Sequence, residues 1–115
     1  MNIEILQAIC KKLPHATEDI KWGHDLCFLI AGKMFCVAGL QLPLMVSFKV
    51  KDEEFDELSN AEGIIPAPYV ARYKWIQVQD ADRFRIGEWE HYISQSYQLV
   101  KEKLPKKLLM KYGIA

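Results

Sequence analysis

The sequence predicts an α+β domain built around an antiparallel sheet. Apolar residues recur at helical spacing near both ends of the chain, and between those ends they alternate or run continuously in short segments. Connections inside the central segment are too short for the crossover that parallel pairing needs, so neighbouring strands there pair antiparallel. The expected order is a helix over 2–13, a meander of strands over 19–50, a short helix over 52–58, a strand over 75–78 and a long helix over 86–104. Because helices flank the strands, we expect the N-terminal and long C-terminal helices to pack on one face of the sheet, as a two-layer sandwich.

Length and charge restrict the classes of protein to consider. A chain of 115 residues is expected to form one domain, residues 1–115, and half of its residues are apolar. Fifteen basic residues balance fifteen acidic ones, so no net charge attracts the whole chain to nucleic acid or to an acidic membrane. A site for a polyanion must therefore be a local patch.

Cysteine usage and apolar runs indicate a cytoplasmic protein. Cys10, Cys27 and Cys36 are odd in number and form no CxxC pair, so buried reduced thiols explain them better than disulfides. The N-terminal residues lack the basic region and apolar run of a signal peptide, and no window reaches 18 apolar residues. We therefore expect no signal peptide and no membrane span.

The two flanking helices have clear boundary signals. Asn2 is the expected N-cap of the first helix, Glu4 suits its first turn, and Pro14 ends it. The long helix carries a stripe wide enough to cover a sheet, formed by Trp89, Tyr92, Ile93, Ser96, Tyr97, Val100 and Leu104. Pro105 closes that helix or opens a last turn.

The central segment predicts three strands, or four if residues 20–22 also pair. Two continuous apolar runs, 26–30 and 34–38, are joined by a tight turn at Gly32, and residues 44–50 then alternate apolar and polar. The acidic segment that follows predicts a short helix capped by Asp52.

The stretch 63–79 combines two prolines with cations and aromatic residues. Neither Pro66 nor Pro68 suits a central strand, because each lacks the N–H of the ladder, so we expect an extended connector. Arg72, Tyr73, Lys74 and Trp75 follow, the densest mixture of cations and aromatic rings in the chain.

No residue pattern points to catalysis, a metal or a cofactor. His15, His24 and His91 are far apart and lack partners at ligand spacing. Nothing beside Cys27 or Cys36 would lower a thiol pKa, and no phosphate loop or dinucleotide motif is present. We expect a protein that is not an enzyme.

An ordered set of short motifs resembles the MmcQ/YjbR family of small bacterial proteins. The motifs are Lys-Trp-Gly at 21–23, Asp25, Gly-Lys-Met-Phe at 32–35, Val-Ser-Phe-Lys at 46–49, Trp-Ile-Gln-Val at 75–78, Ser-Tyr at 96–97 and Leu-Pro-Lys-Lys at 104–107. The resemblance implies a CyaY-like α/β sandwich and a DNA-binding protein with a double-wing motif. One segment departs from the family, because residues 66–74 replace a connector that often carries His or Asn before the tryptophan. A site at that His or Asn would not transfer to this chain.

The basic residues give the candidate nucleic-acid site. We expect wing-like hairpins to present Lys33, Arg72 and Lys74 to phosphates, with Lys106 and Lys107 as auxiliaries. An exposed Trp75 or Tyr73 would stack on a base. The opposing interpretation is that the two rings cover the sheet and the lysines serve solubility.

Two further functions stay open at this level. The chain is expected either to dock a protein partner on an exposed sheet face or edge strand, or to bind a small ligand between Trp22, Tyr69, Trp75 and the long helix.

Overall fold

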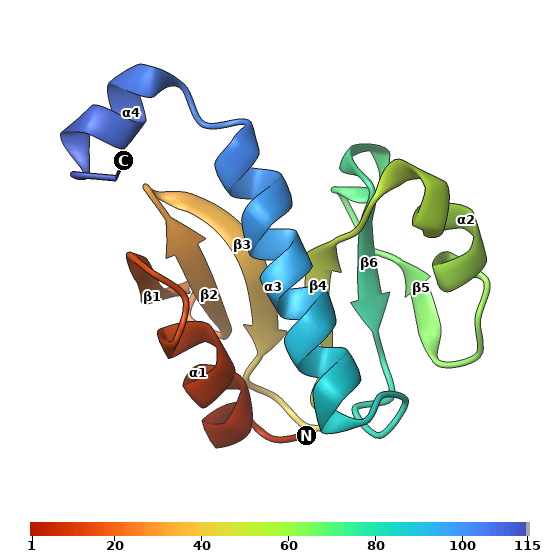
Figure 1. Cartoon of the computed structure of the whole chain (residues 1–115). Helices are drawn as coiled ribbons and strands as arrows, with labels where there is room; N and C mark the ends of the chain where they lie inside the picture. The colour runs from red at the N-terminus through yellow and green to blue at the C-terminus, as the bar shows by residue number, and fades with distance from the viewer. Residues whose placement is uncertain (115) are drawn as a thin grey trace.

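Figure 1 shows the computed structural model, which describes residues 1–114 and confirms the α+β class. One six-stranded antiparallel sheet has the order β1-β2-β3-β4-β6-β5. Its strands are β1 (Ala16–Lys21), β2 (Asp25–Ile30), β3 (Lys33–Gly39), β4 (Val46–Lys49), β5 (Ile64–Pro66) and β6 (Trp75–Val78).

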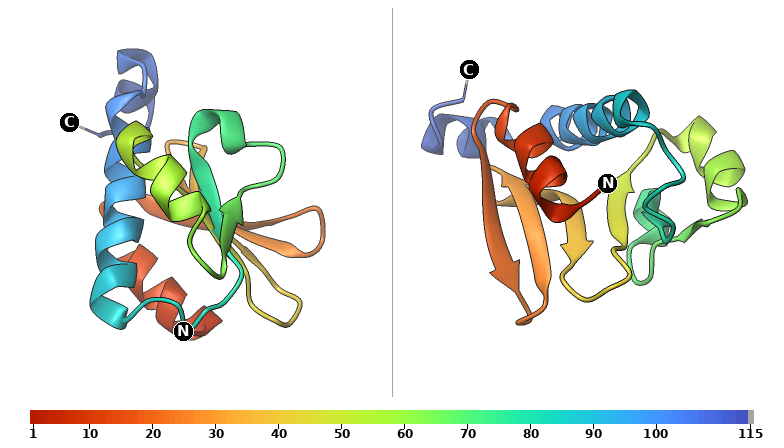
Figure 2. Two further views of the ribbon diagram at one scale, coloured as in Figure 1. Left: turned by 90° about the vertical axis from the view of Figure 1, so that its right-hand side faces the viewer. Right: turned by 90° about the horizontal axis from the view of Figure 1, so that it is seen from below.

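Helices cover one face of this sheet and leave the other face to the loops. The helical segments are α1 (Ile3–Lys11), α2 (Asp52–Ser59), the 3₁₀ turn η1 (Ala71–Tyr73), α3 (Ile86–Glu102) and α4 (Lys106–Lys111). The long helix α3 crosses β2, β3 and β4, and α1 packs beside it against β1, while α2 contacts β5 and β6. Figure 2 shows three connections projecting from the sheet on the side away from α3.

The core lies between α3 and the central strands. Along β4, Val46 and Phe48 are buried under the helices, whereas Ser47 and Lys49 alternate with them and are half-buried. From the helix side, Trp89 is fully buried, and its ring meets Phe48 edge-on with centroids 6.1 Å apart. Alternate residues of the strand and residues spaced by about 3.6 along the helix therefore contribute side chains to one apolar layer.

One buried hydroxyl ties α3 to the sheet. Ser96 Oγ accepts a hydrogen bond from the Lys49 backbone N–H at 2.9 Å and donates one to the Phe35 carbonyl at 2.5 Å. At the next residue of the helix, the Tyr97 hydroxyl donates to the Pro14 carbonyl at 2.6 Å. The two Ser96 bonds hold α3 at one position relative to β3 and β4.

The helix start signals are confirmed at the first helix and wrong at the acidic one. Asn2 is the N-cap of α1, and its side-chain oxygen accepts from the Ile5 N–H at 2.8 Å. The residue before α2 is Lys51, not Asp52, and Glu54 reaches back to accept the Lys51 N–H at 3.1 Å.

The sheet is larger than the sequence predicted. The first strand begins at Ala16, before the range that the sequence predicted. The sequence did not indicate it because β1 is an edge strand, and its mostly exposed residues carry no apolar run. The connector beginning at Pro66 was also wrong in part, since β5 ends at that residue and pairs with β6. A proline is tolerated there because β5 is the other edge of the sheet.

The three cysteines are free and buried, as expected. None of the helices in residues 1–114 combines the length and apolar character needed to cross a membrane.

Candidate functional site

Four cations gather where β4 ends and β6 begins. Lys49 closes β4 and pairs with Trp75, the first residue of β6, which puts Lys74 beside it. Arg72 belongs to the η1 turn, and Lys103 follows α3. We call Lys49, Arg72, Lys74 and Lys103 the cationic cluster.

The surroundings of Lys49 include two of the other cations of the cluster, Lys103 and Lys74. Burial lowers the pKa of the Lys49 ammonium, and the positive charges of Lys103 and Lys74 lower it further, against an opposing effect of Asp52. The Lys49 ammonium donates to the Tyr73 carbonyl. Lys103, Lys74 and the Asp52 carboxylate at the start of α2 therefore all act on the charge of Lys49.

The local fold explains how η1 presents its cations. Lys74 ends the 3₁₀ turn in the left-handed region with φ 66°, and its N–H returns to the Ala71 carbonyl. The Lys74 ammonium lies 5.0 Å from the centroid of the Phe55 ring on α2, and the Arg72 guanidinium lies 4.8 Å from that of Tyr73. Aromatic faces therefore hold both side chains without removing their charge.

Lys33 is exposed at its hairpin, and this hairpin lies beside the residues that follow α4. A Cβ added at Gly32, in the turn before Lys33, would lie 3.4 Å from the Tyr112 hydroxyl. The connections that project freely are the β1–β2 turn, residues 40–45 and residues 67–70 (Figure 2). They carry exposed apolar side chains at Trp22, Leu42 and Tyr69, so the projecting loops are apolar and not basic.

Trp75 is not available to stack on a nucleic-acid base at the cationic cluster. It is only 8% exposed, because β6 lies inside the sheet between β4 and β5. Tyr73, the other candidate ring, is 53% exposed and lies next to Arg72.

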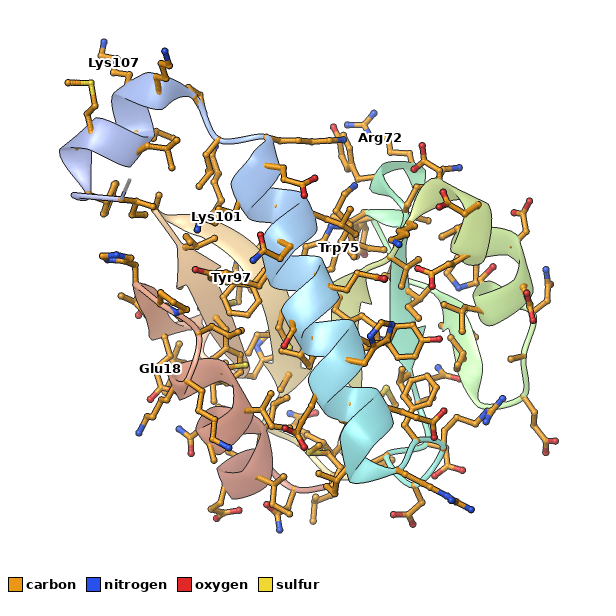
Figure 3. The ribbon with its side chains drawn as sticks, in the orientation of Figure 1. Glu18, Arg72, Trp75, Tyr97, Lys101 and Lys107 are labelled. Atoms are coloured by element: carbon orange, nitrogen blue, oxygen red, sulfur yellow. The ribbon has the colours of Figure 1, made fainter. Side chains whose placement is uncertain are left out.

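Lys106 and Lys107 stand apart from the cluster. They begin α4, a short helix whose Leu108 and Leu109 pack on the core. In Figure 3, Lys107 and Arg72 lie on opposite sides of the C-terminal end of α3. Both lysines are exposed at the same end of the molecule without joining the four clustered cations.

The helix-free face of the sheet holds a groove of about 780 Å³. We call it the open-face groove. Its side chains come from β2, β3, β4 and β6 and from the three projecting connections, and they include Trp22, His24, Asp25, Met34, Leu42, Met45, Ser47, Tyr69, Trp75 and Gln77. Trp22, Tyr69 and Trp75 meet here as the ligand hypothesis expected, but the long helix lies on the other face.

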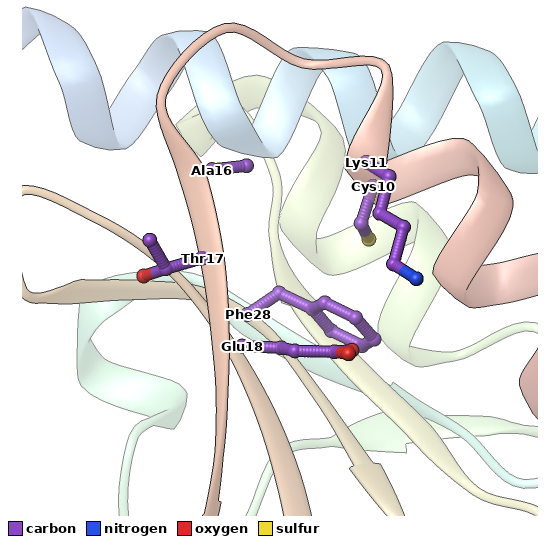
Figure 4. Close-up of a pocket in the computed structure, with 6 residues that line it drawn as sticks. All are labelled: Cys10, Lys11, Ala16, Thr17, Glu18 and Phe28. Carbon is purple, nitrogen blue, oxygen red and sulfur yellow. The ribbon is translucent and has the colours of Figure 1, made fainter.

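A second cavity is much smaller and lies between α1 and β1 (Figure 4). It measures about 180 Å³ and is lined by Cys10, Lys11, Ala16, Thr17, Glu18 and Phe28. The Glu18 carboxylate at its mouth accepts from the Gln7 side-chain amide at 3.1 Å. The one carboxylate that lines this cavity therefore already has an internal partner in Gln7.

The thiols are poor nucleophiles in this environment. Burial raises the pKa of Cys27, and burial together with a hydrogen bond to Cys10 raises the pKa of Cys36 well above its ordinary value. Within residues 1–114, no group of three His, Cys, Asp or Glu side chains is arranged to hold a metal ion.

A family model described as YjbR matches residues 11–99. The chain belongs to the YjbR family. This match spans the sheet and most of α3, so the YjbR domain contains both the cationic cluster, apart from Lys103, and the open-face groove. A search of curated proteins found no match.

Two solved structures share the YjbR fold. A Deinococcus radiodurans protein with the family-model domain DUF419 has a TM-score of 0.85 at 24% identity, over 99% of this chain and 89% of that chain. A Pseudomonas syringae protein has a TM-score of 0.72 at 21% identity, over 86% of this chain and 98% of that chain. At these identities the likeness extends to the fold alone.

Proposed function

We propose that this YjbR-family protein binds the phosphate backbone of nucleic acid through the cationic cluster, and that it acts by binding and not by catalysis. The observation that carries the proposal is that Lys49 and Lys74 meet where β4 pairs with β6, with Arg72 on the adjoining η1 turn. Burial, followed by the nearby charges of Lys103 and Lys74, lowers the pKa of Lys49 and agrees with this gathering. Binding of a polyanion lowers the electrostatic energy of such a cluster, because the attraction to phosphates offsets the repulsion between the cations.

The geometry suits contact with the backbone more than readout of sequence. Arg72 and Lys74 lie on one short turn, and Tyr73 between them exposes a ring for stacking on an unpaired base. A cation on a phosphate responds to charge alone, so the proposed site distinguishes nucleic acid from neutral ligands without selecting a sequence.

The test is binding of labelled duplex and single-stranded DNA across a salt series. We expect a Kd of about 10⁻⁴–10⁻⁶ M at physiological salt, because few phosphates are neutralised. Removing two phosphate contacts with Arg72→Ala and Lys74→Ala should flatten the log–log salt slope by about two and weaken binding to all sequences alike.

A matched control removes the same charge elsewhere. Lys11→Ala with Lys12→Ala takes two exposed cations from the end of α1 and should leave the salt slope unchanged. Equal effects of the two double variants, or no binding even at low salt, would contradict the proposed site.

A second candidate function is binding of a ligand or partner at the open-face groove. It is favoured by the three aromatic side chains that line this groove together, Trp22, Tyr69 and Trp75. It becomes the leading function if DNA does not bind.

A further inference from the structure

Two aromatic residues on the rim of the open-face groove occupy backbone positions that favour glycine or asparagine. The β1–β2 turn has positive φ at both central residues, 56° at Trp22 and 74° at Gly23, and the His24 N–H returns to the Lys21 carbonyl. That pattern is typical of a type I′ turn, in which Asn-Gly is the preferred pair. Trp22 therefore stands where a bulky side chain is disfavoured.

Tyr69 repeats the pattern at the opposite rim. It follows Pro68 and has φ 69°, the arrangement of a type II turn, whose residue after proline is usually Gly or Asn. Trp22 is 66% exposed and Tyr69 is 100% exposed, so burial of the rings does not compensate for the backbone strain. Backbone strain of this kind clusters at functional sites, ligand sites among them.

The groove between these rings has the size and composition of a small-molecule site. Its volume of about 780 Å³ lies inside the range usual for such sites, about 300–1,000 Å³. Below the rim, the floor combines the Trp75 ring and the Met34 and Met45 thioethers with the polar groups of Ser47 and Gln77. A flat ring would find apolar faces on several sides and a few partners for hydrogen bonds.

Charge restricts the ligand further. Among the described side chains that line the groove, Asp25 is the only carboxylate and no lysine or arginine is present. Burial raises the pKa of Cys27 most, and Lys21, Asp25 and Asp19 also act on it, which puts two acids and one lysine around this end of the groove. The local balance at this end, which is distant in the strand order from Lys49 and Lys74, is one negative charge, and that favours a cation over a phosphate here.

We propose that the open-face groove binds a small planar aromatic molecule carrying one positive charge, with the rings of Trp22 and Tyr69 on the rim of the site and the Asp25 carboxylate directing the charge. A cation near the faces of tryptophan and tyrosine gains cation–π attraction, and the Asp25 carboxylate adds to it. This site adjoins the cationic cluster at Trp75 but shares none of its four cations, so it would stand if the proposed nucleic-acid contact failed.

Three indoles of nearly equal shape separate the effect of the ring from the effect of the charge. Tryptamine is cationic, tryptophol is neutral and indole-3-acetate is anionic, and each is titrated into ¹⁵N-labelled protein while amide shifts are followed. We expect saturable shifts at groove residues with tryptamine, weaker binding of tryptophol and the weakest binding of indole-3-acetate. No saturation with tryptamine up to about 5 mM, or tightest binding of the anion, would overturn the proposal.

Variants locate the site. Trp22→Gly and Tyr69→Gly should each weaken tryptamine binding about tenfold, the scale of one lost aromatic stacking partner. Asp25→Asn should weaken tryptamine but not tryptophol. Tyr73→Ala, which removes an exposed ring outside the groove lining, is the matched control and should change neither affinity.

Thermal unfolding of the same variants tests the strain argument. Because glycine adopts positive φ without cost, neither glycine variant should have a lower Tm than the natural protein. A large fall in Tm would show that the rings serve packing. Binding that survives both glycine substitutions would show that the indoles bind elsewhere.

Discussion

At the scale of single residues, some roles follow from neighbours in sequence and others only from the fold. Asn2 was predictable as a cap, since its partner Ile5 lies three residues away. Ser96 was predictable only as part of a stripe, because its partners Lys49 and Phe35 are 47 and 61 residues away. A periodic pattern of apolar residues does not indicate which polar residues make contacts across the fold.

Ser96→Ala should lower the free energy of unfolding by about 1–3 kcal/mol, because it leaves the Lys49 N–H and the Phe35 carbonyl without that partner in a buried place. Urea unfolding followed by circular dichroism measures the change. Ser59→Ala is a suitable comparison, since the Ser59 hydroxyl makes one long bond of 3.4 Å within its own helix, and its cost should be smaller. Equal costs would show that the Ser96 bonds do not stabilise the contact between α3 and the sheet.

The buried thiols predict a loss of stability in alkali. Unfolded thiols ionise near pH 9.0, whereas burial raises the folded pKa of Cys36 and of Cys27. Above pH 9.0 the unfolded chain therefore holds fewer thiol protons than the folded chain, so the free energy of unfolding falls as pH rises through that value. Lys49 acts in the opposite direction because its pKa is lowered, so the contribution of the thiol is isolated by comparison with Cys36→Ala. Urea unfolding from pH 7 to about 10 should show a steeper decline in the natural protein than in this variant.

At the scale of elements, the long helix was predictable and the first strand was not. The stripe of α3 is regular, and Trp89, Ile93, Ser96 and Tyr97 are all buried, as its spacing indicated. Strand β1 has four consecutive exposed residues, so it carries no apolar run at all. An edge strand takes its conformation from its partner β2, which no local pattern records.

Trp89→Ala should cost roughly 3–5 kcal/mol of folding free energy, through lost burial and the cavity that remains between α3 and the sheet. The ring is fully buried and meets both Phe48 and Phe84 edge-on. Thermal or urea unfolding measures the loss, and Trp22→Ala, at an exposed tryptophan, provides the comparison. An unchanged Tm for Trp89→Ala would contradict the assignment of this face of α3 to the core.

At the scale of the whole molecule, the groove could not be derived from the sequence. Trp22, Tyr69 and Trp75 were named together as candidates, but the face of the sheet on which they meet depends on the complete strand order. Lys33 was assigned to a projecting wing because a hairpin was expected there; the hairpin is present and Lys33 is exposed, but only the fold shows that its turn lies beside Tyr112. The charge distribution could not be derived from the sequence either. Acidic and basic residues are equal in number, and this balance gives no sign that Lys49, Lys74 and Lys103 lie close together.

That contrast between net and local charge gives a last prediction. Glu4→Gln with Glu90→Gln raises the net charge by two at the end of the molecule where α1 and α3 begin, away from the cationic cluster (Figure 1). The molecule extends 40 Å along its longest axis, and charges separated by more than about 10 Å are largely screened at 0.1 M salt. The Glu4→Gln, Glu90→Gln variant should therefore leave the salt slope of DNA binding unchanged around 0.1 M salt. Arg72→Ala with Lys74→Ala should flatten that slope. If both double variants move the affinity by the same factor in opposite directions at 0.1 M salt, binding follows net charge, and the cationic cluster is not a defined site.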